Sequence, residues 1–191
     1  LREMFNDHRG RLSNQTQVSA DIKLPELSTE GFVDLYPLLP YQVDLVIQVV
    51  SGLRTQGGAS KHVGGANRTI IKLAQQLLIH PDTKLAEKPV GTLARIDQVY
   101  DLVSSNIPGE IRGKIDEIED KVDHAYAQPV AKVICLLQYV KSIHRTDDNI
   151  AAMLYPSVDA DSKLPQTKEA LSALREAHQV RRGENGYRIP S

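Results

Sequence analysis

One segment of the chain combines residue types that could bind a phosphate group. Residues 57–78 read GGASKHVGGANRTIIKLAQQLL, in which two glycine pairs flank Lys61 and Arg68 lies at the start of an amphipathic helix. A P-loop needs G-x-x-x-x-G-K-[ST] after a strand, because its amides surround the phosphates while its lysine and hydroxyl reach them and the magnesium ion. Here His62 follows the lysine and a helix is expected before the loop. The segment is therefore not a P-loop, and its adjacent glycines do not match the G-x-G-x-x-G dinucleotide fingerprint.

A weaker kind of anion site remains open for this segment. The free amides and the dipole at a helix start favour an anion, and Lys61 and Arg68 would add positive charge. The alternative is that Arg68 is an ordinary solvated residue and that the glycines only allow a turn. The residues alone leave both interpretations open.

Other reactive residue types form no recognisable site. The six histidines are scattered without an H-x-x-x-H or H-E-x-x-H pair, and one cysteine is too few for a zinc site of the usual kind. Cys135 lies in the apolar run AKVICLLQYV, which predicts a buried small residue rather than a reactive thiol. We expect no catalytic residue and no metal site in this chain.

Composition limits the classes of partner. The 191 residues carry a formal net charge of −1, which argues against nucleic-acid binding by the whole surface but leaves room for a local basic patch. No apolar run reaches the length of a membrane span, and the first residues resemble no signal peptide. We expect a cytoplasmic protein without a membrane partner, and Leu1 opens within what reads as a helix, so we expect a longer parent chain.

The first half of the chain predicts one strand and two helices. Residues 17–24 alternate apolar and polar side chains with the period of a half-buried strand, although no partner strand is visible. A helix is expected from about Tyr41 to Leu53, and a second after the glycine loop, with Ile70 and Ile71 as a buried pair. His80-Pro81 should end that second helix.

The middle of the chain predicts a linker and two more helices. EKPVGT, residues 87–92, is a plausible linker, and residues 92–105 and 110–126 each carry an apolar stripe at helical spacing. Residues 106–109, with a proline and a glycine, should separate the two helices.

From Pro129 the pattern changes to three helices and a hairpin. Thr146 should cap the second of these helices, and Pro165 suits the first turn of the third. Asn185-Gly186 should form the tight hairpin turn. This order of elements is that of a winged helix, so the fold class predicted is mainly α, with a short β-hairpin at the end.

The hairpin carries the basic residues best placed to contact DNA phosphates. In a winged helix the third helix would lie in the major groove, but Lys168 and Arg175 there are offset by neighbouring glutamates. Arg181, Arg182 and Arg188 could contact phosphates without reading bases, or could simply keep an exposed hairpin edge soluble.

The same residues suggest a protein family. The stretch DLYPLLPYQVDLVIQVVSGLRTQGGASKHVGGANRTIIKLAQQLL resembles the region after the ATP-binding core of the large P-loop proteins of bacterial phage-resistance systems, of the BREX and phage-growth-limitation (Pgl) type. TLARIDQVYDLV and KEALSALREAHQVRRGENGYRI continue the resemblance. It implies an AAA-like helical lid with one strand in residues 1–88, connecting helices in 89–128 and a winged-helix domain in 129–191.

The resemblance also implies roles for particular residues. Arg68 matches a lid arginine that reaches the terminal phosphates of the nucleotide, with Lys61 and Asn67 as supporting residues. The parent protein would bind ATP with magnesium, but this chain lacks the Walker motifs, so we expect no ATP hydrolysis by it alone. The implied partners are the ATPase core of the same chain and other phage-defence proteins, with DNA as a further candidate. Two alternatives stay open: a free-standing winged-helix DNA-binding regulator, and a structural adaptor that docks protein partners.

Overall fold

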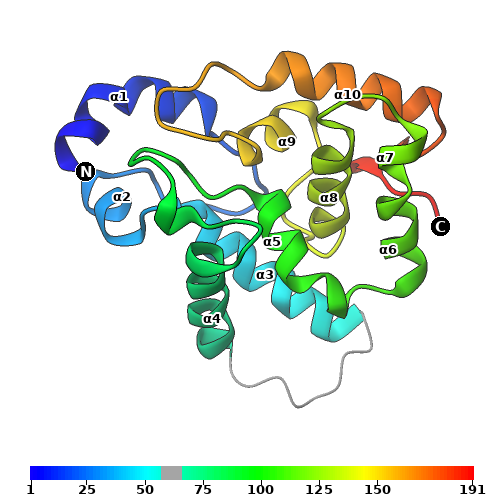
Figure 1. Cartoon of the computed structure of the whole chain (residues 1–191), viewed down its shortest axis with the longest axis horizontal. Coiled ribbons are helices and arrows are strands. Elements are labelled where there is room, and N and C mark those ends of the chain that lie inside the picture. The colour runs from blue at the N-terminus through cyan, green and yellow to red at the C-terminus, as the bar shows by residue number, and fades with distance from the viewer. Residues whose placement is uncertain (57–65) are drawn as a thin grey trace.

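The protein is mainly helical, with a two-stranded antiparallel hairpin near the C-terminus (Figure 1). The computed structural model describes residues 1–56 and 66–191, and for residues 66–68 it describes the backbone alone. At this level the predicted fold class is confirmed. No helix among the described residues is long and apolar enough to cross a membrane.

The elements follow one another along the chain with short connections. The α-helices are α1 (Arg2–Gln15), α2 (Thr29–Leu35), α3 (Pro40–Gln56), α4 (Ala66–Ile79), α5 (Ile96–Val103), α6 (Gly109–Asp116), α7 (Ile118–Lys121), α8 (Ala127–Leu137), α9 (Asp147–Met153) and α10 (Leu164–Glu176). Two short 3₁₀ helices are η1 (Leu85–Glu87) and η2 (Ser104–Asn106), and the hairpin strands are β1 (Arg181–Gly183) and β2 (Gly186–Arg188).

Helix α8 lies at the centre of the hydrophobic core. Its sequence AQPVAKVICLL is apolar nearly all round, and the side chains from Val133 to Leu137 are fully buried. Helices α5, α6, α7, α9 and α10 and strand β2 all pack against it. The core forms one continuous cluster from Phe5 in α1 to Ile189 after β2. All three predicted segments contribute to this cluster, and their division into domains stays a prediction.

Residues 17–24 do not form the strand predicted from their alternation. The segment is extended, but it makes only one isolated β-bridge, between Ala20 and Ile143, and the amide of Asp21 donates to the Ser142 carbonyl at 2.8 Å. Ile22 is 48 % exposed, so the alternation does not bury every second residue. The prediction was wrong because the alternation reports partial burial, which an isolated extended segment can also have.

A buried side chain holds this extended segment in place. The Asn149 amide oxygen accepts from the Ser19 N–H at 2.9 Å, and its NH₂ group donates to the carbonyls of Ser19 and His144, both at 2.9 Å. An asparagine amide thus replaces the missing neighbouring strand as hydrogen-bond partner. Residues 19–21 therefore have hydrogen-bond partners within this chain.

The motif YPLLPYQ, residues 36–42, holds the segment that was predicted to be a linker. The Tyr36 hydroxyl accepts from the Gly91 N–H at 2.7 Å, and the Pro37 carbonyl accepts from the Ala94 N–H at 2.9 Å. The buried Gln42 donates to the Ala94 carbonyl at 2.8 Å. Residues 87–92 are therefore no free linker at their C-terminal end, where Gly91 is buried.

Two helical predictions need correction. The helix expected over residues 110–126 is broken at Glu117 into α6 and α7, which both pack on α8, and it ends at Lys121. The break lets Ile115 and Ile118 both reach the core. In α4 the buried residues are Leu73 and Leu77, so Ile71 points away and is 70 % exposed. The expected pairing of Ile71 with Ile70 in the core was wrong, because Ile71 lies about 200° around the helix from Leu73.

The predicted starts of α9 and α10 are confirmed, and the predicted hairpin turn is shifted by one residue. The Thr146 hydroxyl accepts from the Asn149 N–H at 3.2 Å at the start of α9, and Pro165 lies in the first turn of α10. The hairpin turn consists of residues 184–185, one residue earlier than predicted, and Gly186 follows it with φ +94°. Glycine is required there because a Cβ atom would lie 2.2 Å from the Arg145 carbonyl oxygen.

Candidate functional site

The residues predicted to sense a nucleotide fall at the edge of the described structure. Lys61 and the side chains of Asn67 and Arg68 lie outside the described residues. The backbone of α4 begins at Ala66, which places Asn67 and Arg68 in the first turn of this helix, as the sequence suggested. Their role in nucleotide sensing stays a prediction.

The hairpin places the three predicted arginines on two faces. Arg181 pairs directly with Arg188 across the strands, and Arg182 pairs with Tyr187. Because side chains directly opposite each other project from the same face, Arg181 and Arg188 share one face and Arg182 lies on the other. All three arginines are exposed.

Arg145 is a fourth arginine at the hairpin, and no local pattern in the sequence places it there. It lies between α8 and α9, and its N–H donates to the Asn185 carbonyl while its carbonyl accepts from the Tyr187 N–H, each at 3.0 Å. Its Nε also donates to the Tyr187 carbonyl. Burial, and after it the positive charge of Arg188, lower the pKa of Arg145. Arg145, Arg181 and Arg188 thus form one group, here called the arginine face.

The opposite face of the hairpin is organised around Tyr187. The Arg182 guanidinium lies 5.8 Å from the centroid of this buried ring, at cation–π distance. Burial, and after it a hydrogen bond to the Asp147 carboxylate, raise the pKa of the Tyr187 phenol, whereas Arg182 and Arg175 act in the opposite direction. Arg182 therefore has a contact with the Tyr187 ring, on the other side of the hairpin from Arg181 and Arg188.

Within the described part of the chain, no acidic side chain forms an ion pair with Arg145, Arg181, Arg182 or Arg188. Glu184, in the hairpin turn, is exposed like its neighbours. Two arginines directly opposite each other repel, and like charges in such a position destabilise a hairpin. The arginine face is therefore suited to bind an external anion with oxygen acceptors, since guanidinium groups donate to such oxygens in pairs.

Lys168 lies apart from the arginine face. It is exposed in the second turn of α10, at the opposite end of this helix from the hairpin. The neighbouring Glu169 carboxylate lies 3.5 Å from the His124 Nε2 atom, and Lys168 and Glu169 together give this end of α10 both signs of charge. The structure does not bring Lys168 together with the three predicted arginines.

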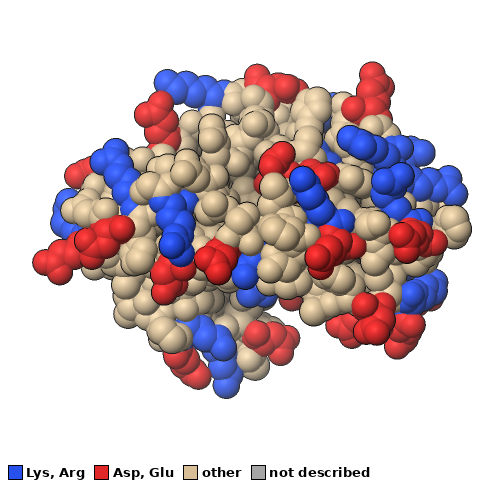
Figure 2. All heavy atoms as spheres, turned by 90° about the horizontal axis from the view of Figure 1, so that it is seen from above, with Lys and Arg blue, Asp and Glu red and all other residues tan. Residues whose placement is uncertain are grey.

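The charged residues on the face drawn in Figure 2 are mixed. Figure 2 shows Lys and Arg interspersed with Asp and Glu over the face seen from above, with several basic side chains gathered toward the end that carries α6, α7 and the C-terminus in Figure 1. This mixing agrees with the net charge of −1. Binding to an anionic polymer must therefore depend on a local group of residues.

The described residues contain no cluster of three or more His, Cys, Asp or Glu side chains that could hold a metal ion. Cys135 is buried in α8, as predicted, and burial raises the pKa of its thiol to about 12. A thiol with so high a pKa is a poor nucleophile near neutral pH. Cys135 is therefore a packing residue.

Comparisons with known proteins supply no identity for the chain. No protein-family model matches it, and no solved structure matches it significantly.

Proposed function

We propose that this chain is a non-catalytic module of a cytoplasmic phage-defence ATPase, and that its C-terminal hairpin contacts the phosphate backbone of DNA. The resemblance of residues 34–78 to the region after the ATP-binding core of such ATPases supports the first part. The arginine face supports the second part. ATP and magnesium would be bound by the core of the parent protein, and other defence proteins would be further partners.

The observation that carries the DNA proposal is the position of Arg181 opposite Arg188, with Arg145 beside them and no acidic partner in the described structure. The repulsion between these arginines is relieved when phosphate oxygens lie between them. The order α8, α9, α10 and hairpin, with Arg145 bridged to Gly186 in β2, supports the proposal of a winged helix. In this arrangement the hairpin is the wing, and it lies beside the duplex.

The charge of α10 indicates which kind of DNA contact to expect. Base reading by this helix would call for basic or amide side chains on its exposed face, but Glu169 and Glu176 accompany Lys168 and Arg175 there. Contacts to phosphates fix the orientation of a protein on DNA without carrying sequence information. We therefore expect binding with little sequence preference.

The proposal is tested by measuring DNA binding at low and moderate salt. The protein should bind a duplex at low salt and release it as salt rises, because phosphate contacts displace counterions. Replacing Arg181, Arg182 and Arg188 together with alanine should reduce this binding to the weak level that a single phosphate contact, from Arg145, can support. The matched control replaces the exposed lysines Lys23, Lys88 and Lys141, which form no ion pair in the described structure, and should keep it.

Two results would contradict the DNA proposal. Retained affinity in the triple arginine variant would move the DNA site elsewhere on the protein. No binding at low salt would favour the adaptor, in which the hairpin docks a protein partner.

A second function, nucleotide sensing by Arg68, is supported by the position of this residue in the first turn of α4. The Arg54 guanidinium donates to the Thr69 hydroxyl at 3.4 Å, which attaches this turn to α3. Arg68→Ala in the full-length parent should lower ATP turnover without unfolding the protein. Unchanged turnover and unchanged defence would remove Arg68 from the mechanism, and Lys61 and Asn67 with it as supporting residues.

A further inference from the structure

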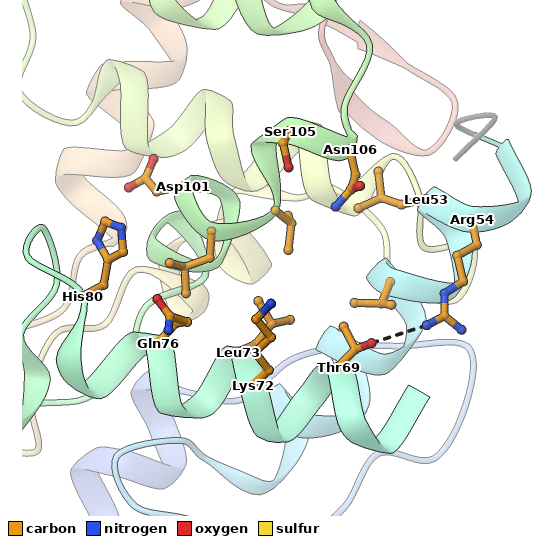
Figure 3. Close-up of a pocket in the computed structure, with 13 residues that line it drawn as sticks. Leu53, Arg54, Thr69, Lys72, Leu73, Gln76, His80, Asp101, Ser105 and Asn106 are labelled. Carbon is orange, nitrogen blue, oxygen red and sulfur yellow. Dashed lines mark hydrogen bonds between the residues drawn. The ribbon is translucent and has the colours of Figure 1, made fainter. Parts of the chain in front are cut away.

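A cleft of about 540 Å³ lies between α3, α4 and the segment formed by α5 and η2 (Figure 3). Its volume is in the range of small-molecule sites. The floor of the cleft consists of aliphatic side chains that are partly or fully buried: Val50, Leu53, Leu73, Leu102 and Val103. Such a floor favours a ligand with an apolar body.

The rim of the cleft is rich in hydrogen-bond donors. Lys72 extends from α4 over the floor, is exposed, and forms no ion pair with any described residue. Arg54, at the end near Thr69, belongs to the same rim. At the opposite end lies the His80 ring, whose Nδ1 atom is 3.2 Å from the Asp82 backbone nitrogen and 3.6 Å from the Asp82 carboxylate.

The acidic side chain that lines the described part of the cleft is already neutralised. Asp101 lies 2.7 Å from the Lys132 ammonium nitrogen, which is in turn 5.7 Å from the centroid of the Tyr100 ring. Asp101 and Lys132 together contribute no net charge. Lys72 adds a positive charge to the rim.

We propose that this cleft binds a small organic anion whose apolar body covers the aliphatic floor and whose anionic group contacts Lys72. The uncharged rim side chains Gln76, Ser105 and Asn106 can donate further hydrogen bonds to the same ligand. The site is separate from the hairpin and does not depend on DNA binding.

Two fluorescent probes with the same rings test this proposal. 8-Anilinonaphthalene-1-sulfonate carries an anionic sulfonate, and N-phenyl-1-naphthylamine lacks it. The folded protein should bind the sulfonate probe saturably and about tenfold more tightly than the neutral one, which corresponds to one charge-assisted hydrogen bond. Lys72→Glu should weaken the sulfonate probe at least about tenfold and leave the neutral probe nearly unchanged.

The control makes the same charge change away from the cleft. Lys141→Glu, also at an exposed lysine, should leave the affinity of both probes as in the unmodified protein. Amide chemical-shift changes on titration with the sulfonate probe should lie in residues 50–54, 69–80 and 101–106. Equal affinity for the two probes, equal weakening by Lys72→Glu and Lys141→Glu, or shift changes confined to other elements would each overturn the proposal.

Discussion

The two faces of the hairpin lead to different expectations for its arginines. If a duplex lies against the arginine face, Arg181 and Arg188 contact phosphates together with Arg145, whereas Arg182 stays on the Tyr187 ring. The test therefore compares two variants of the protein. One is a double variant that combines Arg181→Gln with Arg188→Gln, and the other is Arg182→Gln alone. Glutamine keeps much of the side-chain length but removes the charge.

The magnitude follows from counterion release. Three phosphate contacts give a slope of log affinity against log salt of about −2.7, so affinity should fall roughly 40-fold between about 50 and 200 mM salt. The double variant, with one contact left, should have a slope of about −0.9 and lose affinity only about three- to fourfold over the same range. Arg182→Gln should keep the full slope.

Fluorescence anisotropy of a labelled duplex, measured at several salt concentrations, gives these slopes directly. The division of the arginines between two faces is refuted if Arg182→Gln makes the salt dependence as shallow as the double variant does. It is refuted equally if the double variant keeps the slope of the unmodified protein. Circular dichroism should show that all variants are folded, because the three side chains are exposed.

Three further predictions concern stability. Gly186→Ala should lower the free energy of unfolding by about 3 kcal/mol or more, because it combines a positive φ with a Cβ 2.2 Å from the Arg145 carbonyl oxygen. Calorimetry should then show a Tm lower by roughly 6–12 °C, and a shift below about 2 °C would contradict this geometry. Asn149→Ala should lower the free energy of unfolding in urea by about 2–3 kcal/mol, because the backbone groups of Ser19 and His144 lose their hydrogen-bond partner. The control Asn6→Ala, at an exposed position, should change this free energy little. Equal effects of the two substitutions would contradict the role of Asn149. The Cys135 thiol has an ordinary pKa near 9, and burial raises this pKa to about 12 in the fold. Between these two pH values the unfolded chain binds fewer protons than the folded one, so the free energy of unfolding should fall by about 1.4 kcal/mol per pH unit more than in Cys135→Ala. Parallel pH profiles of stability for the two proteins would contradict this.

Local signals in the sequence predicted much of the helical order. The Thr146 cap, Pro165 in the first turn of α10 and the apolar run of α8 each depend on residues within a few positions, and each is confirmed. The strand over residues 17–24 failed because its hydrogen-bond partner, the Asn149 side chain, is far away in the sequence. Periodicity reports which side chains face inward, but it does not report what the backbone pairs with.

The candidate site was predictable in part for the same reason. Arg181, Arg182 and Arg188 are visible as a basic hairpin, and their exposure agrees with the expectation. The pairing register was needed to divide them between two faces, and it is shifted by one residue from the expected turn. Arg145 could not be predicted to join them, because only the folded backbone brings the α8–α9 connection to the hairpin. The cleft beside Lys72 likewise requires three helices that sequence spacing does not place relative to one another.

The connection between α8 and α9 is attached to two distant parts of the chain. Arg145 is joined to the hairpin by backbone hydrogen bonds, and four residues later Asn149 holds Ser19 in the N-terminal segment. Mechanical load on the hairpin would therefore pass through this connection to residues 17–21 as well as back along α10. Removing residues 1–19 would remove the hydrogen bonds between Ser19 and Asn149. The connection that supports the hairpin, more than 100 residues away in sequence, would then be held less firmly.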